Sequence, residues 1–176
     1  MLSRYLPAQN LQIEFLNKWR NQDKYPSDDI FAPRNYSFDY LFAITMFAQP
    51  LAWFEGTGLP SEAFATSALI RTYRQHSSRI HAGNIFPIGN EPDGRQWTGF
   101  QSIADEKTGY MLVFREDNPA TRMAVPLLIP PGKQVTFTRV AGSGKTFRAG
   151  VSARKSVPFE LPQKNSFGLY QYTVTP

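Results

Sequence analysis

Carboxylates are the side chains of this sequence best suited to catalysis, since the chain has no cysteine and only two histidines. Four of them cluster around the polar loop of residues 21–35 and the apolar stretch that follows it: Asp28, Asp29, Asp39 and Glu55. Two carboxyl groups about 5 Å or about 7–9 Å apart can cleave a glycosidic bond. The same residues could instead cap a loop, as for Asp28 and Asp29, or anchor the ends of a helix, as for Asp39 and Glu55. Both interpretations stay open.

Aromatic side chains add a second element of sugar recognition. Trp53 and Trp97 could stack on the face of a sugar ring, although core packing is the usual role of aromatics at a density of 14%. We therefore take Asp28, Asp29, Trp53 and Trp97 as candidate substrate-binding residues, and we assign no catalytic residue.

Three other patterns do not meet the requirements of a known site. The stretch 141–146, Ala-Gly-Ser-Gly-Lys-Thr, has Arg139 where a phosphate-binding loop needs glycine, and residues 147–151 read as a strand instead of the required helix. We expect a hairpin turn there. His76 and His81 are five residues apart, so they do not share a helix face. We expect neither a metal nor a cofactor.

Positive charge is concentrated in the second half of the chain, whose total net charge is +5. Between residues 133 and 164 only Glu160 opposes seven cations: Lys133, Arg139, Lys145, Arg148, Arg154, Lys155 and Lys164. A nucleic-acid surface would show this pattern, and so would solvated strand edges that discourage aggregation. We expect the second, and therefore no nucleic-acid partner.

The rest of the chain is organised around the apolar stretch from Tyr36 to Glu55. Its uncharged run of about 15 residues makes about 22 Å of helix, whereas a bilayer core needs roughly 20 residues. Pro50 also favours a kink or a helix end near Gln49. We predict a buried core helix and no membrane span. The N-terminus has no apolar signal-peptide core, and the compartment is left unknown.

Two further helices and a long loop surround this stretch. Residues 10–20 have apolar side chains four apart, which predicts a short amphipathic helix. Residues 21–35 form a polar loop of a length that is often functional. A second helix is predicted from Pro60 to about His81, stopped by Gly83 in the left-handed conformation.

After Gly83 the pattern changes to short strands separated by turn residues. Eight strands are predicted, near residues 85–88, 97–103, 110–115, 123–128, 134–140, 146–151, 157–161 and 169–174. This spacing favours an antiparallel β-sandwich. We therefore predict an α+β protein, with a helical segment over residues 1–82 and a sandwich over residues 83–176.

The order of these features resembles the C-terminal end of a melibiase-type α-galactosidase, a retaining glycoside hydrolase. Residues 48–55 are similar to the apolar helix late in that family's barrel. Residues 71–74 and 79–83 resemble the long helix that leaves the barrel, and residues 86–89, 97–101 and 110–115 resemble the start of its terminal sandwich. The resemblance covers roughly residues 2–173.

This resemblance implies a (β/α)8 barrel end followed by an antiparallel sandwich. Members of the family use two aspartates at barrel strand ends, the nucleophile in a Lys-x-Asp context. The present sequence has no Lys-x-Asp, so that position has no counterpart here. The resemblance implies a carbohydrate ligand and a chain that supports the barrel without a complete catalytic pair.

The helix of residues 36–55 would then be covered by barrel elements that this sequence does not encode. We expect its apolar face to contact the rest of a barrel or to drive self-association. The alternative is a stand-alone carbohydrate-binding or interaction module, which would be a stable monomer with an exposed aromatic sugar site.

Overall fold

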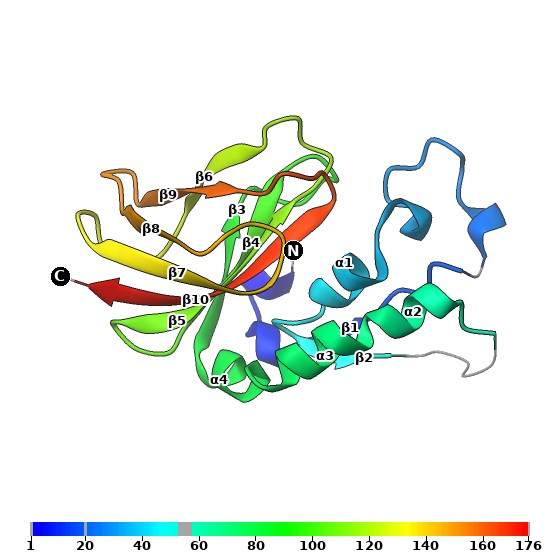
Figure 1. Ribbon diagram of the computed structural model, residues 1–176, viewed down its shortest axis with the longest axis horizontal. Coiled ribbons are helices and arrows are strands. Elements are labelled where there is room, and N and C mark those ends of the chain that lie inside the picture. The colour runs from blue at the N-terminus through cyan, green and yellow to red at the C-terminus, as the bar shows by residue number, and fades with distance from the viewer. Residues whose placement is uncertain (1, 20, 53–57, 176) are drawn as a thin grey trace.

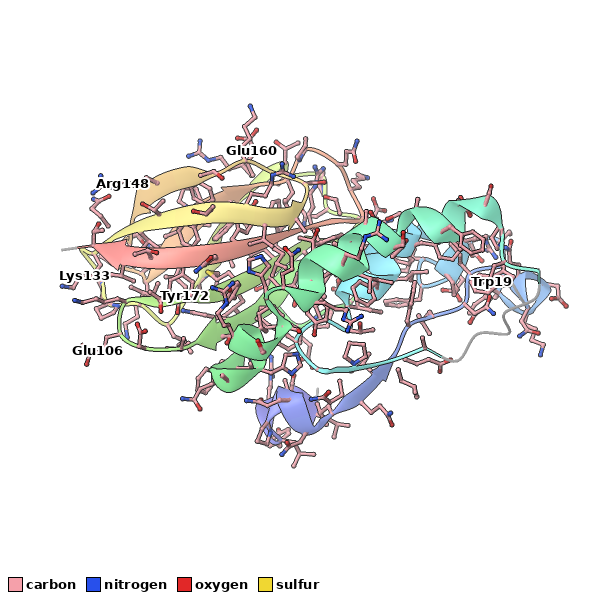
Figure 2. All side chains as sticks on the ribbon, turned by 60° about the horizontal axis from the view of Figure 1, so that its bottom comes forward. Trp19, Glu106, Lys133, Arg148, Glu160 and Tyr172 are labelled. Carbon is pink, nitrogen blue, oxygen red and sulfur yellow. The ribbon has the colours of Figure 1, made fainter. Side chains whose placement is uncertain are left out.

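The computed structural model describes residues 2–19, 21–52 and 58–175. A β-sandwich occupies one end of the molecule, and the helices with a short strand pair occupy the other (Figure 1). Figure 2 labels Trp19 at the helical end and Glu106 at the far end of the sandwich. The predicted α+β fold with an antiparallel sandwich is confirmed.

The larger sheet has six strands in the order β3-β4-β5-β10-β7-β8, and every neighbouring pair is antiparallel. Their bounds are β3 Asn84–Gly89, β4 Trp97–Ile103, β5 Thr108–Arg115, β7 Gln134–Gly142, β8 Phe147–Gly150 and β10 Ser166–Thr175. The second sheet pairs β6 (Arg122–Pro126) with β9 (Ser156–Glu160). All eight predicted strands are present, and residues 143–146 form the predicted turn between β7 and β8.

The space between the two sheets is filled by aromatic and branched side chains. Phe137 of β7 lies at its centre, with ring centroids 4.8 Å from Phe147, 5.0 Å from Phe159 and 6.4 Å from Tyr170. Close packing of large rings stabilises the sandwich through the apolar area removed from water.

The other face of the large sheet is covered by helices, and β5 shows why. Tyr110, Leu112 and Phe114 point to the helices, while Met111 and Val113 point into the sandwich. All five are buried, so this central strand reads as a continuous apolar run with weak alternation. The helical segment and the sandwich therefore share one layer of core.

The predicted helix of residues 36–55 is much shorter in the structure. Helix α1 spans Phe38–Ala43, with the Ser37 hydroxyl accepting a hydrogen bond from Tyr40 N at 3.1 Å. Turns follow over residues 44–47, and Gln49–Leu51 form strand β2. Trp53 to Thr57 lie outside the described residues.

The prediction that this stretch leaves an exposed apolar face is wrong. Leu41, Phe42, Met46 and Phe47 are all buried, in the cluster that also holds Leu112, Phe114 and Leu169 of the sheet. The chain thus covers its most apolar segment with its own sandwich. None of the described helices is long and apolar enough to cross a membrane.

The predicted helix of residues 60–81 is helical but divided into three: α2 Ser61–Ala65, α3 Ser67–Arg74 and α4 Ser77–Ala82. Its predicted apolar side is confirmed, because Leu69, Tyr73 and Ile80 are buried. The two histidines join this segment to its neighbours, since a ring nitrogen of His76 lies 3.0 Å from Tyr110 Oη and one of His81 lies 3.1 Å from Met46 O.

Gly83 does not stop the helix in the predicted way. Its φ of −83° and ψ of 166° are extended, so the left-handed conformation is not used. Glycine is required there for space, because a Cβ atom would lie 2.3 Å from the Ser102 hydroxyl oxygen and 2.9 Å from the Ile103 carbonyl oxygen.

The predicted amphipathic helix of residues 10–20 is wrong. Short 3-10 turns occupy Leu2–Arg4 and Ala8–Asn10, and Gln12–Glu14 form strand β1, which pairs in parallel with β2. Leu11 accepts a hydrogen bond from Gln49 N at 2.8 Å, and Phe15 N donates to Leu51 O at 2.7 Å. A partner nearly forty residues away overrides the local helical pattern.

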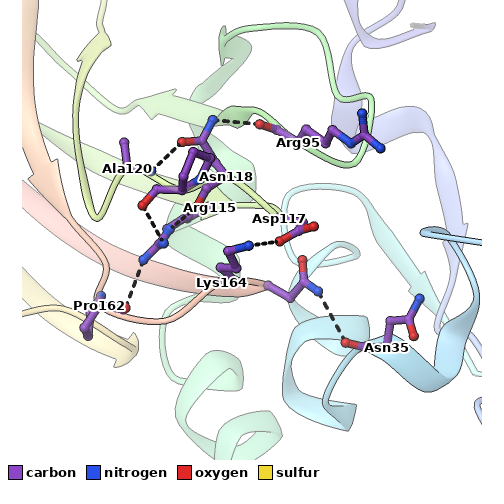
Figure 3. Close-up of polar contacts among 10 residues, drawn as sticks. Asn35, Arg95, Arg115, Asp117, Asn118, Ala120, Pro162 and Lys164 are labelled. Carbon is purple, nitrogen blue, oxygen red and sulfur yellow. Dashed lines mark hydrogen bonds and ion pairs between the residues drawn. The ribbon is translucent and has the colours of Figure 1, made fainter. Parts of the chain in front are cut away.

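A buried arginine ties the end of β5 to the loops around it (Figure 3). Arg115 is 3% exposed, and its guanidinium donates to the carbonyl oxygens of Asn118, Leu161 and Pro162 at 2.8–2.9 Å and of Pro119 at 3.2 Å. One side chain therefore satisfies four carbonyl groups that would otherwise lack a donor.

We expect Arg115→Ala to lower the free energy of unfolding by about 3 kcal/mol, because buried carbonyl oxygens lose their donor. Urea denaturation of the wild-type chain and the variant measures this difference. Arg154→Ala removes the same charge at an exposed turn and should change stability by less than about 0.5 kcal/mol. Equal effects of the two substitutions would contradict the role given to Arg115.

Candidate functional site

The parallel strands β1 and β2 place their carboxyl ends at one edge of the helical half of the molecule. Helix α1 connects them, and helices α2 to α4 follow β2. In parallel α/β structures the carboxyl ends of neighbouring strands meet at the same edge, and the loops that follow them carry the site. We call the described residues 15–19 and 21–37, which follow β1, the rim loop.

The rim loop is held together by its own polar side chains. The Arg34 guanidinium donates to the carbonyl oxygens of Gln22, Tyr25 and Pro26. Tyr36 Oη donates to Ile30 O at 2.8 Å, so two side chains near the end of the loop bond back to the backbone of its middle part. Neither Arg34 nor Tyr36 was singled out from the sequence, because backbone carbonyl partners leave no sequence motif.

The two predicted aspartates have different surroundings. Asp29 Oδ1 accepts a hydrogen bond from Phe31 N at 2.8 Å, and Asp29 O accepts from Asn35 Nδ2 at 2.8 Å. Asp28 is exposed and has no hydrogen bond or ion pair to any described residue. Asp29 therefore shapes the loop, and the Asp28 carboxylate is free to bind a ligand.

The two predicted tryptophans are not brought together with these aspartates. Trp97 is 2% exposed, its indole Nε1 donating to Ala120 O at 3.2 Å, so neither ring face is open to a sugar. Trp53 and Glu55 lie outside the described residues. Trp19 is a half-buried aromatic of the rim loop, with its ring centroid 5.6 Å from that of Phe38.

Asp39 lies at a polar cavity between the rim loop and the sandwich. The cavity measures about 540 Å³ and is lined by Asn35, Ser37, Asp39, Gly142, Ser143 and residues 163–167. Asn165 joins the two sides, its Nδ2 donating to Asn35 O at 3.4 Å (Figure 3). Its φ of 48° is unusual for a residue other than glycine, and no sequence signal pointed to it.

Negative charge gathers around Tyr36, beside this cavity. Burial raises the pKa of the Tyr36 phenol, and the charges of Glu116, Asp29 and Asp117 raise that pKa further. Lys164 opposes them: its hydrogen bond and charge lower the pKa of the Asp117 carboxyl, whose Oδ1 lies 2.5 Å from Lys164 Nζ. The Tyr36 phenol therefore lies near three carboxylates, one of which is paired with Lys164.

In the described part of the chain, no three histidine, aspartate or glutamate side chains form a group that could hold a metal ion. The functional groups of the rim loop are instead hydrogen-bond donors and acceptors. Such groups, with carboxylates, suit the recognition of a neutral polyol.

The fold is similar to that of two solved galactosidase structures. The galactosidase domain of the α-galactosidase-sucrose kinase AgaSK matches 99% of this chain with a TM-score of 0.65 and 13% identity. A GH36 α-galactosidase AgaA variant from Geobacillus stearothermophilus, in complex with 1-deoxygalactonojirimycin, matches 79% with a TM-score of 0.54 and 12% identity.

These matches confirm the predicted resemblance to the C-terminal region of such galactosidases, at the level of the fold. The chain spans about a quarter of the length of those structures, 23% of the first and 20% of the second. No family model matches the sequence, and no curated protein sequence matches it significantly.

We expect Asp29→Ala to cost about 1 kcal/mol of unfolding free energy, because Phe31 N loses its acceptor. Asp28→Ala, at the neighbouring exposed position, should cost less than about 0.5 kcal/mol. Thermal or urea unfolding compares the two variants directly. A larger loss for Asp28→Ala than for Asp29→Ala would contradict the division of roles between them.

Proposed function

We propose that this chain forms the end of a glycoside hydrolase barrel together with its C-terminal sandwich, and that its rim loop contributes to an α-galactoside site. The observation that carries the proposal is the parallel pair β1–β2, connected through α1 and followed by α2 to α4. A strand-helix-strand-helix order with parallel strands is the repeating unit of a (β/α)8 barrel.

The rim loop supports the substrate part of the proposal. It follows the carboxyl end of β1, which is where barrel enzymes place their sites, and it presents the unpaired Asp28 carboxylate. The two solved structures with this fold are galactosidases by name, one of them in complex with 1-deoxygalactonojirimycin. In this proposal the catalytic pair belongs to other strands of the barrel, and the chain supplies positioning and sugar contacts.

Binding of methyl α-galactoside tests the sugar site. We expect weak, saturable binding by the 176-residue chain, measured by ligand-observed NMR. Asp28→Asn should lower the affinity several-fold, because the carboxylate that accepts hydrogen bonds from sugar hydroxyls loses its charge. Glu106→Gln removes one exposed carboxylate at the opposite end of the sandwich and should leave binding unchanged (Figure 2).

Absence of binding, or an equal loss of affinity in both variants, would contradict the proposal that the rim loop contributes to a sugar site. Hydrolysis of a nitrophenyl α-galactoside by the chain alone would contradict the part that places the catalytic pair elsewhere.

The outer edges of β1 and β2 support the barrel part of the proposal. Along a strand, the backbone N–H and C=O groups of successive residues point alternately to the strand on one side and to the other side. The backbone groups of Leu11 and Phe15 form hydrogen bonds to β2, so those of Gln12 and Glu14 point away from β2. Among the described residues no third strand pairs with either edge. Pro50 has no N–H, so β1 is the better template for a further strand.

We therefore expect concentration-dependent self-association of the isolated chain through the β1 edge, measured by light scattering. Gln12→Pro removes one outward N–H and should reduce this association, whereas Gln12→Thr keeps the N–H and should not. A wild-type chain that is monomeric at every concentration, or variants that behave alike, would count against the open edge.

A further inference from the structure

A second cavity lies on the sandwich, where its two sheets meet at their edges. It measures about 500 Å³ and opens between β8, β9 and the turn of residues 143–146. Figure 2 labels Arg148 and Glu160 on this side of the sandwich, away from Trp19 of the rim loop. A cavity of this size is typical of a small-molecule site.

The charges of this cavity are unbalanced. Arg122, Lys145 and Arg148 line it, with Glu160 as the opposing group, so three cations and one carboxylate leave a net charge of +2. None of the four forms an ion pair with another described residue. The ion pairs among the described residues are Arg4–Glu91, Lys18–Glu62 and Lys164–Asp117. Unpaired cations at a concave surface create a positive potential that attracts anions.

The glycine-rich turn adds backbone donors to these cations. Gly144, Lys145 and Thr146 line the cavity, and their backbone N–H groups have no acceptor within the described residues. Successive unpaired N–H groups at a left-handed glycine can form an anion-binding concavity, and Gly144 has a φ of 87°. The turn is not a phosphate-binding loop of the strand-to-helix kind, yet it offers the same type of donor.

The turn could not hold this position with another residue at Gly144. A Cβ atom there would lie 2.2 Å from Tyr170 Oη and 3.1 Å from Glu160 O. Glycine therefore lets the turn approach β9 closely, which brings the donors of the turn to the same cavity as Glu160. Two of the seven cations of residues 133–164, Lys145 and Arg148, thus meet the glycine-rich turn at this cavity.

The remaining lining groups favour a sugar as the carrier of the anion. Phe147 is half-buried, with one ring face stacked on Phe137 at 4.8 Å, and Pro158 adds an apolar wall. Apolar walls suit the C–H faces of a pyranose ring, and the Glu160 carboxylate can accept hydrogen bonds from sugar hydroxyls.

We propose that this cavity binds an anionic saccharide, with its carboxylate or sulfate group held by Lys145, Arg122 and the turn N–H groups, and its hydroxyls by Glu160. That an anion binds here follows from the cavity itself. That the anion is carried by a sugar rests on the proposed function. The site is separate from the α-galactoside site, since the two share no residue.

Isothermal titration at low ionic strength tests this proposal with three probes: an oligogalacturonide, a sulfated galactan oligosaccharide and a neutral galactan oligosaccharide. We expect at least one acidic probe to bind and the neutral probe not to bind. Which acidic probe binds more tightly distinguishes a carboxylate ligand from a sulfate ligand.

Lys145→Ala should weaken the binding of the acidic probe about tenfold, as for the loss of one hydrogen bond to a charged group. Arg148→Gln removes another cation that lines the cavity and keeps the length of the exposed side chain. We expect it to weaken the binding of the acidic probe as well. Arg154→Ala is the matched control: it removes one exposed charge of the same basic region outside the cavity and should change the affinity less than twofold.

Equal binding of the neutral probe, or no binding of either acidic probe, would overturn the proposal. So would an equal loss in Lys145→Ala and Arg154→Ala, since that shows a diffuse charge effect. Tighter binding of a single-stranded oligonucleotide than of both acidic probes would replace it with a nucleic-acid surface. Asp28→Asn should leave these titrations unchanged, so failure of the galactoside site and failure of this site are measured separately.

Discussion

The six-stranded sheet has apolar side chains on both faces, and both must be removed from water. The pair β6–β9 covers one face, where Phe137 meets Phe159 and Tyr170. Helices α1, α3 and α4 cover the other, where Leu112 and Phe114 meet residues 38–47. Because this second layer is shared, the short parallel strands and the rim loop are fixed relative to the sandwich. The positions of both candidate sites follow from this double coverage.

Backbone carbonyls, more than charged partners, hold the irregular parts of the molecule in place. Arg115 gathers the loops at one end of the sandwich, and Arg34 closes the rim loop in the same manner. The five donors of a guanidinium suit this task, since each can point to a different carbonyl. Charged groups that are not used in this way, such as Asp28, Lys145 and Arg148, lie at the surface and are available to ligands.

The strands of the sandwich were predictable because their signals are local. Turn residues at short intervals and alternation in stretches such as 134–140 identify strands without knowledge of their partners. The helix predicted over residues 10–20 failed because Gln12–Glu14 pair with residues 49–51. The apolar face predicted to be exposed is buried by the chain's own sheet over the described residues 38–47, and Trp97 is buried in the sandwich core on the other face of that sheet. Each failure came from a contact between residues distant in sequence.

The sequence by itself determined the fold class, the eight strands and the hairpin turn within residues 141–146. It also showed the excess of positive charge between residues 133 and 164. Periodicity and turn propensity are properties of neighbouring residues, so they can be read without a structure. Only the tertiary structure decided that β1 and β2 are parallel, that Asp29 is engaged while Asp28 is free, and that Arg122, Lys145 and Glu160 share one cavity. Those facts depend on which backbone groups and charges the folded chain brings together, and sequence spacing does not encode that proximity.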